Sequence, residues 1–119
     1  MVVTICMRRQ FAAAHWLPLM PDGHKCKTLH GHTYSVEVRL SGEPNERGII
    51  VDYDELDAAW ERHVKPLVDH KTLNDTPGLE NPTTEVLAPF LLARFAALFA
   101  QVSSVRVYES SSTWCEATR

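Results

Sequence analysis

The chain has 119 residues, of which 45% are hydrophobic and 23% are charged. These proportions are typical of a globular protein and exclude a disordered one, and the length suits a single domain over residues 1–119. The formal net charge is −3 and no basic run is present, so nucleic acid is excluded as the main partner and a small ligand is favoured.

The three cysteines, Cys6, Cys26 and Cys115, are an odd number without paired spacing, and no secretory leader precedes them. They predict free thiols in a reducing cytoplasm. No apolar run approaches the ~18–20 residues that a membrane-spanning helix needs. We therefore expect a cytoplasmic protein without a membrane partner.

Residues 2–14 open with an alternation of apolar and polar side chains, which predicts a strand that ends near His15. Residues 16–29 contain two prolines and a glycine and predict a loop longer than a hairpin needs. Long loops in compact domains are usually functional, and this one delivers Cys26 beside a group of histidines.

Residues 32–42 form the clearest predicted strand. If it begins at or just before His30, its period of two places His30 and His32 on one face, about 6.5–7 Å apart at the backbone. Antiparallel pairing with the first strand would bring His15 across the ladder from them. Three neutral imidazoles without a fourth ligand are typical of catalytic zinc with an open coordination position, although three unconnected histidines at strand ends remain the alternative.

Asp52 is placed to cap a helix whose apolar stripe runs through residues 56–67. Pro66 is expected to kink or end this helix, because its ring clashes with the preceding turn and it has no amide proton. On the same stripe, Trp60 is expected in the core and His63 in the core or an interface.

A second, broadly buried helix is predicted from Thr83 or Thr84 to about residue 100. Two strands follow, at residues 102–109 and 113–118, and Trp114 is expected in the core. The order strand, strand, helix, helix, strand, strand predicts an α+β fold, with two helices on one face of a four-stranded antiparallel sheet. Its two exposed edges predict a homo-oligomer in which subunits join their sheets.

Five spaced motifs together resemble the 6-pyruvoyl-tetrahydropterin synthase superfamily, and they cover nearly the whole chain in the same order. They are Ala13-Ala14-His15, Cys26-x-x-x-His30-Gly31-His32, Asp69-His70-x-x-Leu73-Asn74, Asn81-Pro82-Thr83-Thr84-Glu85 and Val107-Tyr108-Glu109. Within the superfamily, the chain is most similar to the bacterial 6-carboxy-5,6,7,8-tetrahydropterin synthases of queuosine biosynthesis, because only three residues separate Cys26 from His30.

The resemblance implies the tunnelling fold, in which subunits assemble around a central β-barrel, as a hexamer or another ring, with active sites at subunit interfaces. It implies zinc bound by the matches of three family histidines, His15, His30 and His32. It also implies that Cys26 is a proton-transfer base that works with the pair of Asp69 and His70. Glu109 is implied to anchor the pterin ring, with the hydroxyls of Thr83 and Thr84 nearby.

The implied substrate is 7,8-dihydroneopterin triphosphate, which the bacterial branch converts to 6-carboxytetrahydropterin with release of acetaldehyde and triphosphate. Lys25 and Lys27, with His24 and Lys71, are the local candidates for the phosphates, since no glycine-rich phosphate loop is present. The competing functions are the pyruvoyl-forming elimination of triphosphate and a non-catalytic zinc- or pterin-binding module.

The residues themselves suit this chemistry. Zinc is a Lewis acid for adjacent hydroxyls, a thiolate favoured by Lys25 and Lys27 can accept a carbon-bound proton, and one carboxylate can accept two adjacent N–H groups of a pterin. Other interpretations stay open at this point. Cys26 can instead close a structural zinc site, the Asp69–His70 pair can simply end a helix, and Glu109 can guard a sheet edge.

Overall fold

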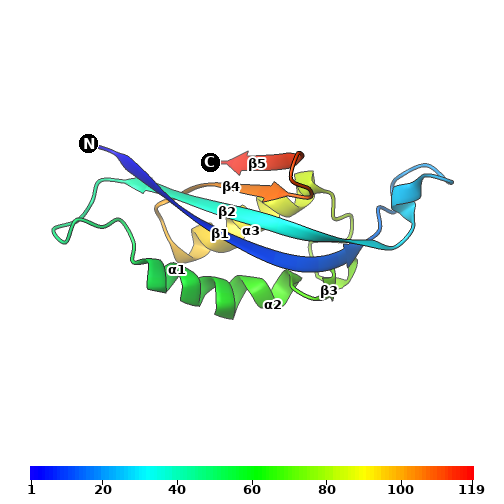
Figure 1. Cartoon of the computed structure of the whole chain (residues 1–119), viewed down its shortest axis with the longest axis horizontal. Coiled ribbons are helices and arrows are strands. Elements are labelled where there is room, and N and C mark those ends of the chain that lie inside the picture. The colour runs from blue at the N-terminus through cyan, green and yellow to red at the C-terminus, as the bar shows by residue number, and fades with distance from the viewer.

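The computed structural model describes residues 1–119 as one twisted sheet with helices against one of its faces (Figure 1). The strands are β1 (Val3–His15), β2 (His30–Gly42), β3 (Lys71–Thr72), β4 (Val102–Tyr108) and β5 (Trp114–Thr118). Their spatial order is β3-β1-β2-β4-β5, and every neighbouring pair is antiparallel except the parallel pair of β3 and β1.

The two long strands β1 and β2 form a hairpin in continuous register, from Val3 opposite Gly42 to His15 opposite His30. On its other side, β2 begins to pair with β4 only at Ser35. The first residues of β2 therefore project with the end of β1 beyond β4, and they carry the loop of residues 16–29 at the right of Figure 1.

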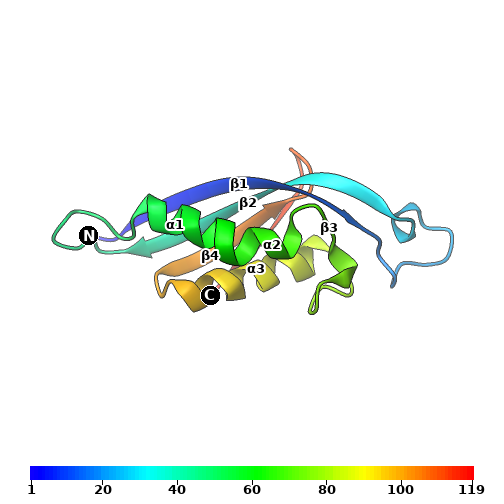
Figure 2. The same cartoon turned by 90° about the horizontal axis from the view of Figure 1, so that it is seen from below.

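The helices form two rods that lie on the same face of the sheet (Figure 2). The first rod consists of α1 (Tyr53–Ala59), a π-helical turn (Trp60–Val64) and α2 (Lys65–Val68), and the second is α3 (Thr84–Leu98). Short 3-10 turns occur at Lys25–Lys27 and Leu73–Asp75.

The first rod begins after Asp52, its N-cap, and ends shortly after Pro66. The Asp52 carboxylate accepts a hydrogen bond from the Asp54 amide, as expected of an N-cap. Before Pro66 the helix widens into its π turn, where the Lys65 amide bonds the Trp60 carbonyl, and the helix ends at Val68. The wider turn accommodates the proline ring within the helix. The rod nevertheless ends at Val68, close to Pro66 as predicted.

The core lies between the inner face of the sheet and the two rods. Its largest fully buried side chains include Trp60, Tyr34, Phe11, Phe95, Leu40, Leu56, Leu87 and Leu91. The fully buried residues of α3 are Leu87, Ala88, Leu91 and Phe95, on the side of the helix that packs against β4 and β5. The expected broad burial extends in part to Val86 and Phe90, which pack against the core, but it is wrong for the exposed Ala93, Ala97 and Leu98.

Three other expectations need correction. The sheet has five strands and is mixed, because β3 pairs in parallel with Ala13 and Ala14 of β1. This strand is only two residues long, so the sequence shows no alternation from which to predict it. Trp114 lies outside the core at the surface, where the Arg106 guanidinium stacks 3.7 Å from its ring centroid. His63 is exposed on the first rod, which overturns its expected place in the core while its place in an interface stays a prediction, whereas Trp60 is buried as predicted.

None of the helices combines the length and the apolar composition needed to cross a bilayer.

Two leucines of α3 test this packing. Leu87 is 0% exposed and Leu98 is 41% exposed. We expect Leu87→Ala to lower the free energy of unfolding by about 2–5 kcal/mol, because it leaves a cavity under the sheet, and Leu98→Ala to lower it by less than about 1 kcal/mol. Urea unfolding of both variants measures the difference, and equal losses would contradict the described face of α3.

Candidate functional site

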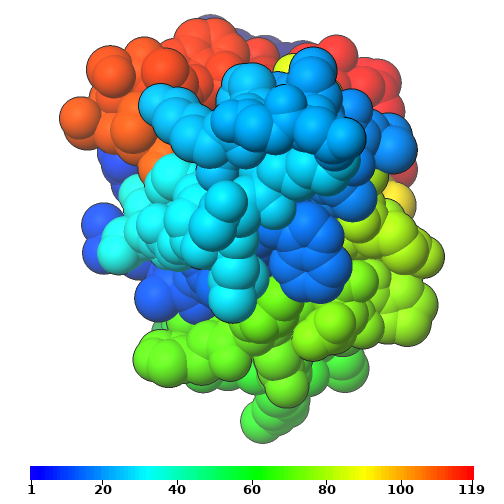
Figure 3. Space-filling model, turned by 90° about the vertical axis from the view of Figure 1, so that its right-hand side faces the viewer, coloured from blue at the N-terminus to red at the C-terminus, as the bar shows by residue number.

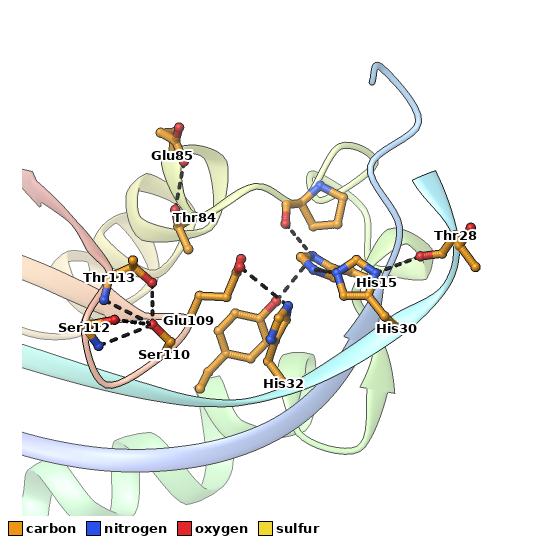
Figure 4. A network of polar contacts seen from close by, with 12 residues as sticks. His15, Thr28, His30, His32, Thr84, Glu85, Glu109, Ser110, Ser112 and Thr113 are labelled. Atoms are coloured by element: carbon orange, nitrogen blue, oxygen red, sulfur yellow. Dashed lines mark hydrogen bonds and ion pairs between the residues drawn. The ribbon is translucent and has the colours of Figure 1, made fainter. Parts of the chain in front are cut away.

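Three histidines converge at the projecting end of the β1–β2 hairpin (Figure 4). His15 pairs directly with His30 across the ladder, and His32 follows on the same face of β2. One ring nitrogen from each residue lies within 4.8 Å of the other two. The expected convergence of these side chains is confirmed, and the cluster can hold a metal ion.

Hydrogen bonds to main-chain carbonyls fix two of the three imidazole tautomers. His15 Nδ1 lies 2.9 Å from the Pro82 carbonyl oxygen, and His30 Nδ1 lies 2.7 Å from that of Thr28. A carbonyl can only accept, so each Nδ1 carries the proton and donates it. When both imidazoles are neutral, each Nε2 is left with a lone pair, and these two atoms face each other across 3.1 Å.

This arrangement fits a bound cation. Two facing lone pairs with no proton between them repel each other, and a metal ion that both nitrogens coordinate removes this repulsion. Two nitrogens that share a tetrahedral zinc ion lie about 3.3 Å apart, close to the observed spacing. In addition, His32 Nε2 is buried and has no hydrogen-bond partner, which is costly unless an ion satisfies it.

Burial favours the neutral imidazole that a metal requires. His15 is only 1% exposed. Burial lowers its pKa, and the nearby His30 acts in the same direction, although the hydrogen bond to Pro82 opposes them. The neutral form needs no deprotonation before it binds a metal.

Tyr34 supports the cluster from the core side, a role that the strand pattern alone did not reveal. Its hydroxyl lies 3.3 Å from His15 Nδ1, and its ring stacks on Phe11 with 4.9 Å between centroids. Burial raises the pKa of Tyr34, so it remains a neutral phenol. The only available signal was its place two residues after His32 on the same face of β2.

A cavity of about 330 Å³ opens beside the histidines. It is lined by Lys25, Cys26, His30, His32 and Glu109. The Cys26 amide donates to His24 Nδ1, which caps the 3-10 turn. The Cys26 sulfur is not part of the histidine cluster, so in this structure it borders the site without closing it.

Glu109 joins this cavity to a neighbouring one of about 320 Å³, which Thr83, Thr84 and Trp114 also line. Its Oε1 lies 3.5 Å from His32 Nε2. Thr83 caps α3 by accepting the Val86 amide. Figure 3 looks onto this end of the molecule, where the loop of residues 16–29 and the turn after β4 reach the surface near each other.

The Asp69–His70 pair lies apart from Cys26 within the chain. Asp69 caps the end of α2, and its carboxylate accepts hydrogen bonds from His70 Nδ1 at 2.9 Å and the Ala12 amide at 3.0 Å. His70 lines another groove with Ala12 and Lys71, and of the residues of the Cys26 cavity only His32 also lines this groove. His70 has a φ of +56° and a side chain that is 82% exposed. Such a conformation is unusual for a non-glycine residue and is frequent at functional sites.

Of the three lysines expected at the phosphates, only Lys25 lines the cavity, and Lys71 lines the groove that also contains His70. Lys27 Nζ pairs with the Asp22 carboxylate in the same loop. The single chain therefore brings together the three histidines, Cys26, Lys25 and Glu109, with Thr83 and Thr84 adjacent. It does not bring Lys27, Asp69 or His70 into the same cavity.

Comparisons with known proteins give this site a context. The model of the 6-pyruvoyl tetrahydropterin synthase family matches residues 4–119. A protein of Synechocystis sp. named 6-carboxy-5,6,7,8-tetrahydropterin synthase is 38% identical over 109 residues, which are 87% of this chain and 83% of that protein. A Pyrococcus furiosus protein named dihydroneopterin monophosphate aldolase is 36% identical over 94 residues, which are 79% and 75% of the two chains.

The fold is also shared with a solved structure. Caenorhabditis elegans 6-pyruvoyl tetrahydropterin synthase superposes with a TM-score of 0.89 over 99% of this chain and 96% of that one, at 22% sequence identity. The two proteins therefore have the same α+β architecture.

The metal affinity of the cluster can be tested by replacing one of its histidines and, as a control, a histidine outside it. We expect His15→Ala to weaken Co²⁺ binding at least about 100-fold, because it removes a ligand whose hydrogen bond to Pro82 already orients it. The exposed His63 is the control, and His63→Ala should leave the affinity unchanged. Competition with a chromophoric chelator measures both, and wild-type affinity in the His15 variant would refute the cluster as a metal site.

Stability at acidic pH tests the Asp69 contacts. Burial alone would raise the pKa of Asp69, but the hydrogen bonds from His70 and the Ala12 amide outweigh it and hold that pKa below its usual value. The pKa of Asp69 is therefore lower in the folded state than in the unfolded state, where it is about 3.9. The ionised carboxylate stabilises the fold fully at pH values above the unfolded-state pKa. This contribution disappears as pH falls through the folded-state pKa.

Urea unfolding at a series of pH values provides the measurement. The wild type should exceed Asp69→Asn in stability at pH 6, and the gap should close as pH falls toward about 2. A gap that stays constant over this range would show that the carboxylate charge contributes nothing to the fold.

Proposed function

Since the chain belongs to the 6-pyruvoyl tetrahydropterin synthase family, we propose that it is a zinc-dependent lyase of queuosine biosynthesis. With one molecule of water, it converts 7,8-dihydroneopterin triphosphate to 6-carboxy-5,6,7,8-tetrahydropterin and releases acetaldehyde and triphosphate. The observation that carries this proposal is the cavity beside the metal-binding nitrogens, where a thiol, Cys26, and a carboxylate, Glu109, border the same space.

The pterin ring is assigned to Glu109. The 2-amino group and the adjacent ring N–H of a pterin are neighbouring donors, and one carboxylate can accept both. Glu109 lies between the cavity of Cys26 and the cavity lined by Thr83 and Thr84. A ring anchored there can place its side chain toward the histidines while the hydroxyls of the two threonines lie beside the ring.

His15, His30 and His32 hold the zinc, and no fourth side chain belongs to their cluster. When bound, zinc supplies a Lewis acid for the hydroxyl oxygens of the substrate side chain. The carbonyls of Pro82 and Thr28 keep both Nε2 lone pairs directed at the ion. These hydrogen bonds also prevent the rings from turning away when substrate enters.

Cys26 acts as the base that removes a proton from a hydroxyl-bearing carbon of the side chain. Lys25 borders the same cavity. The 3-10 turn and its His24 cap fix the cysteine backbone beside the histidines. The cysteine is therefore already positioned before substrate arrives.

A second copy of the chain supplies the other proton-transfer pair, Asp69 and His70. Within one chain this pair lies in a different groove from Cys26, and His70 faces solvent. The sheet offers the means of assembly, because β5 has no outer neighbour and β1 is covered by β3 only at Ala13 and Ala14. Joining these edges into a ring would give a homo-oligomer with its active sites at subunit interfaces.

One second candidate is supported by the similarity to the Pyrococcus furiosus protein named dihydroneopterin monophosphate aldolase. Of the three lysines expected at the phosphates, only Lys25 borders the cavity, and one cation suits one phosphate group. Aldol cleavage of the same side chain would release a phosphorylated two-carbon aldehyde instead of acetaldehyde. The two reactions therefore differ in both products.

Product analysis tests the proposal. Zinc-loaded protein incubated with 7,8-dihydroneopterin triphosphate should give a product with the mass of 6-carboxytetrahydropterin and a stoichiometric amount of acetaldehyde. A pyruvoyl product without acetaldehyde would overturn the assignment within the family. Turnover of the monophosphate alone would favour the aldolase, and no turnover at full zinc occupancy would favour a binding module.

The role of Cys26 is tested in the same assay. Cys26→Ala should reduce the rate at least about 100-fold and leave zinc content unchanged, because a general base contributes about 10²–10⁴-fold. Cys6, an exposed thiol on the outer face of β1, is the matched control, and Cys6→Ala should turn over normally. Loss of zinc from the Cys26 variant would instead identify this thiol as a structural ligand.

A further inference from the structure

We propose that Asn74 is a positioning residue for the metal site: its side-chain amide holds His15 and the Cys26 loop in the geometry that binds the ion. The inference rests on the metal role proposed for His15. Asn74 lies in the Asp69-His70-x-x-Leu73-Asn74 motif but lines neither cavity of the proposed site.

Just after the end of β1, the side-chain amide of Asn74 makes the two main-chain hydrogen bonds to Trp16 that a neighbouring strand would otherwise make. Its Oδ1 accepts the Trp16 amide at 3.0 Å, and its Nδ2 donates to the Trp16 carbonyl at 2.8 Å. Nδ2 also donates to the Glu80 carbonyl at 3.3 Å. One side chain therefore makes three hydrogen bonds to two separate segments of main chain.

Both segments determine the orientation of His15. Trp16 directly follows His15, so its two hydrogen bonds fix the backbone that carries the imidazole. Glu80 lies two residues before Pro82, whose carbonyl accepts the His15 Nδ1 proton. Asn74 thus ties the chain that carries the metal ligand to the chain that sets the tautomer of that ligand.

The same link extends to the cysteine. The Leu17 amide donates to the Cys26 carbonyl at 2.8 Å, so the two arms of the long loop are joined immediately beyond Trp16. If the bonds of Asn74 to Trp16 are lost, the start of the loop loses its main-chain attachment next to His15. The position of Cys26, which is joined to the following residue Leu17, is then held less firmly beside the histidines.

Asn74 is itself anchored to the core. It is the central residue of the 3-10 turn Leu73–Asp75, and Leu73 is fully buried. Only a side-chain amide offers an acceptor and two donors here. Aspartate would retain the acceptor for the Trp16 amide but would direct a carboxylate oxygen at two carbonyl oxygens, and alanine would lose all three contacts.

The test measures Co²⁺ affinity, by chelator competition, in the full-length variants Asn74→Ala and Asn74→Asp. We expect affinity to fall about 10–100-fold in both, the range found when an outer partner of a metal ligand is removed. The visible absorption spectrum of bound Co²⁺ should also change, because the position of His15 changes. Circular dichroism confirms that each variant is folded.

Asn45 supplies a matched control. Its Oδ1 accepts the Arg47 and Ile49 amides in the loop before α1, at the end of the sheet away from the histidines (Figure 1). Asn45→Ala removes side-chain to main-chain hydrogen bonds of the same kind. It should lower the melting temperature and leave both the affinity and the spectrum of Co²⁺ unchanged.

Three results would overturn the proposal: wild-type Co²⁺ affinity in a folded Asn74 variant, an unchanged Co²⁺ spectrum, or an equal loss of affinity in Asn45→Ala. If neither Asn74 variant folds, hydrogen exchange in the wild-type protein decides. Because coupling is reciprocal, Co²⁺ should slow exchange of the Trp16 amide and leave the Ile49 amide unaffected, and no slowing at Trp16 would refute the link.

A failure of this proposal is distinguishable from a failure of the metal site itself. Normal Co²⁺ affinity in His15→Ala would refute the site. Loss of affinity in His15→Ala together with normal affinity in both Asn74 variants would refute only the positioning role.

Discussion

Two imidazole lone pairs that face each other across 3.1 Å are the constraint on which this site depends. Neither ring can turn to relieve the repulsion without losing its hydrogen bond to a main-chain carbonyl, of Pro82 for His15 and of Thr28 for His30. An ion that accepts both lone pairs removes the repulsion and also satisfies the buried Nε2 of His32. The folded chain is therefore already organised for a cation, and little reorganisation is required when one binds.

The fold produces this constraint through the length and register of one hairpin. Because β1 and β2 pair continuously to His15 and His30 and extend past the start of β4 pairing, the histidines lie where the sheet is open on one side. The core beneath them is fully buried, with Tyr34 stacked on Phe11. The groups that would act on a substrate come instead from loops and turns around this end of the sheet, which supply Cys26 and Glu109.

The pairing of the histidines was predictable from the sequence, because a period of two places His30 and His32 on one face and antiparallel pairing of the two strands brings His15 across from them. The order of the six major elements was also predictable from periodicity and capping residues. The contacts that make the cluster effective were not, since the carbonyl of Pro82 and the amide of Asn74 act on residues far away in sequence, and a main-chain acceptor has no residue signature. Strand β3 was missed because two residues carry no alternation. The separation of His70 from Cys26 also required coordinates.

X-ray absorption at the zinc K-edge of the zinc-loaded, substrate-free protein is the most direct test of an open three-histidine site with a free thiol beside it. We expect a first shell of nitrogen and oxygen only, at about 2.0–2.1 Å, with the multiple scattering of three imidazoles. A sulfur scatterer at about 2.3 Å would contradict this expectation, because Cys26 would then close the coordination sphere and could not serve as the base.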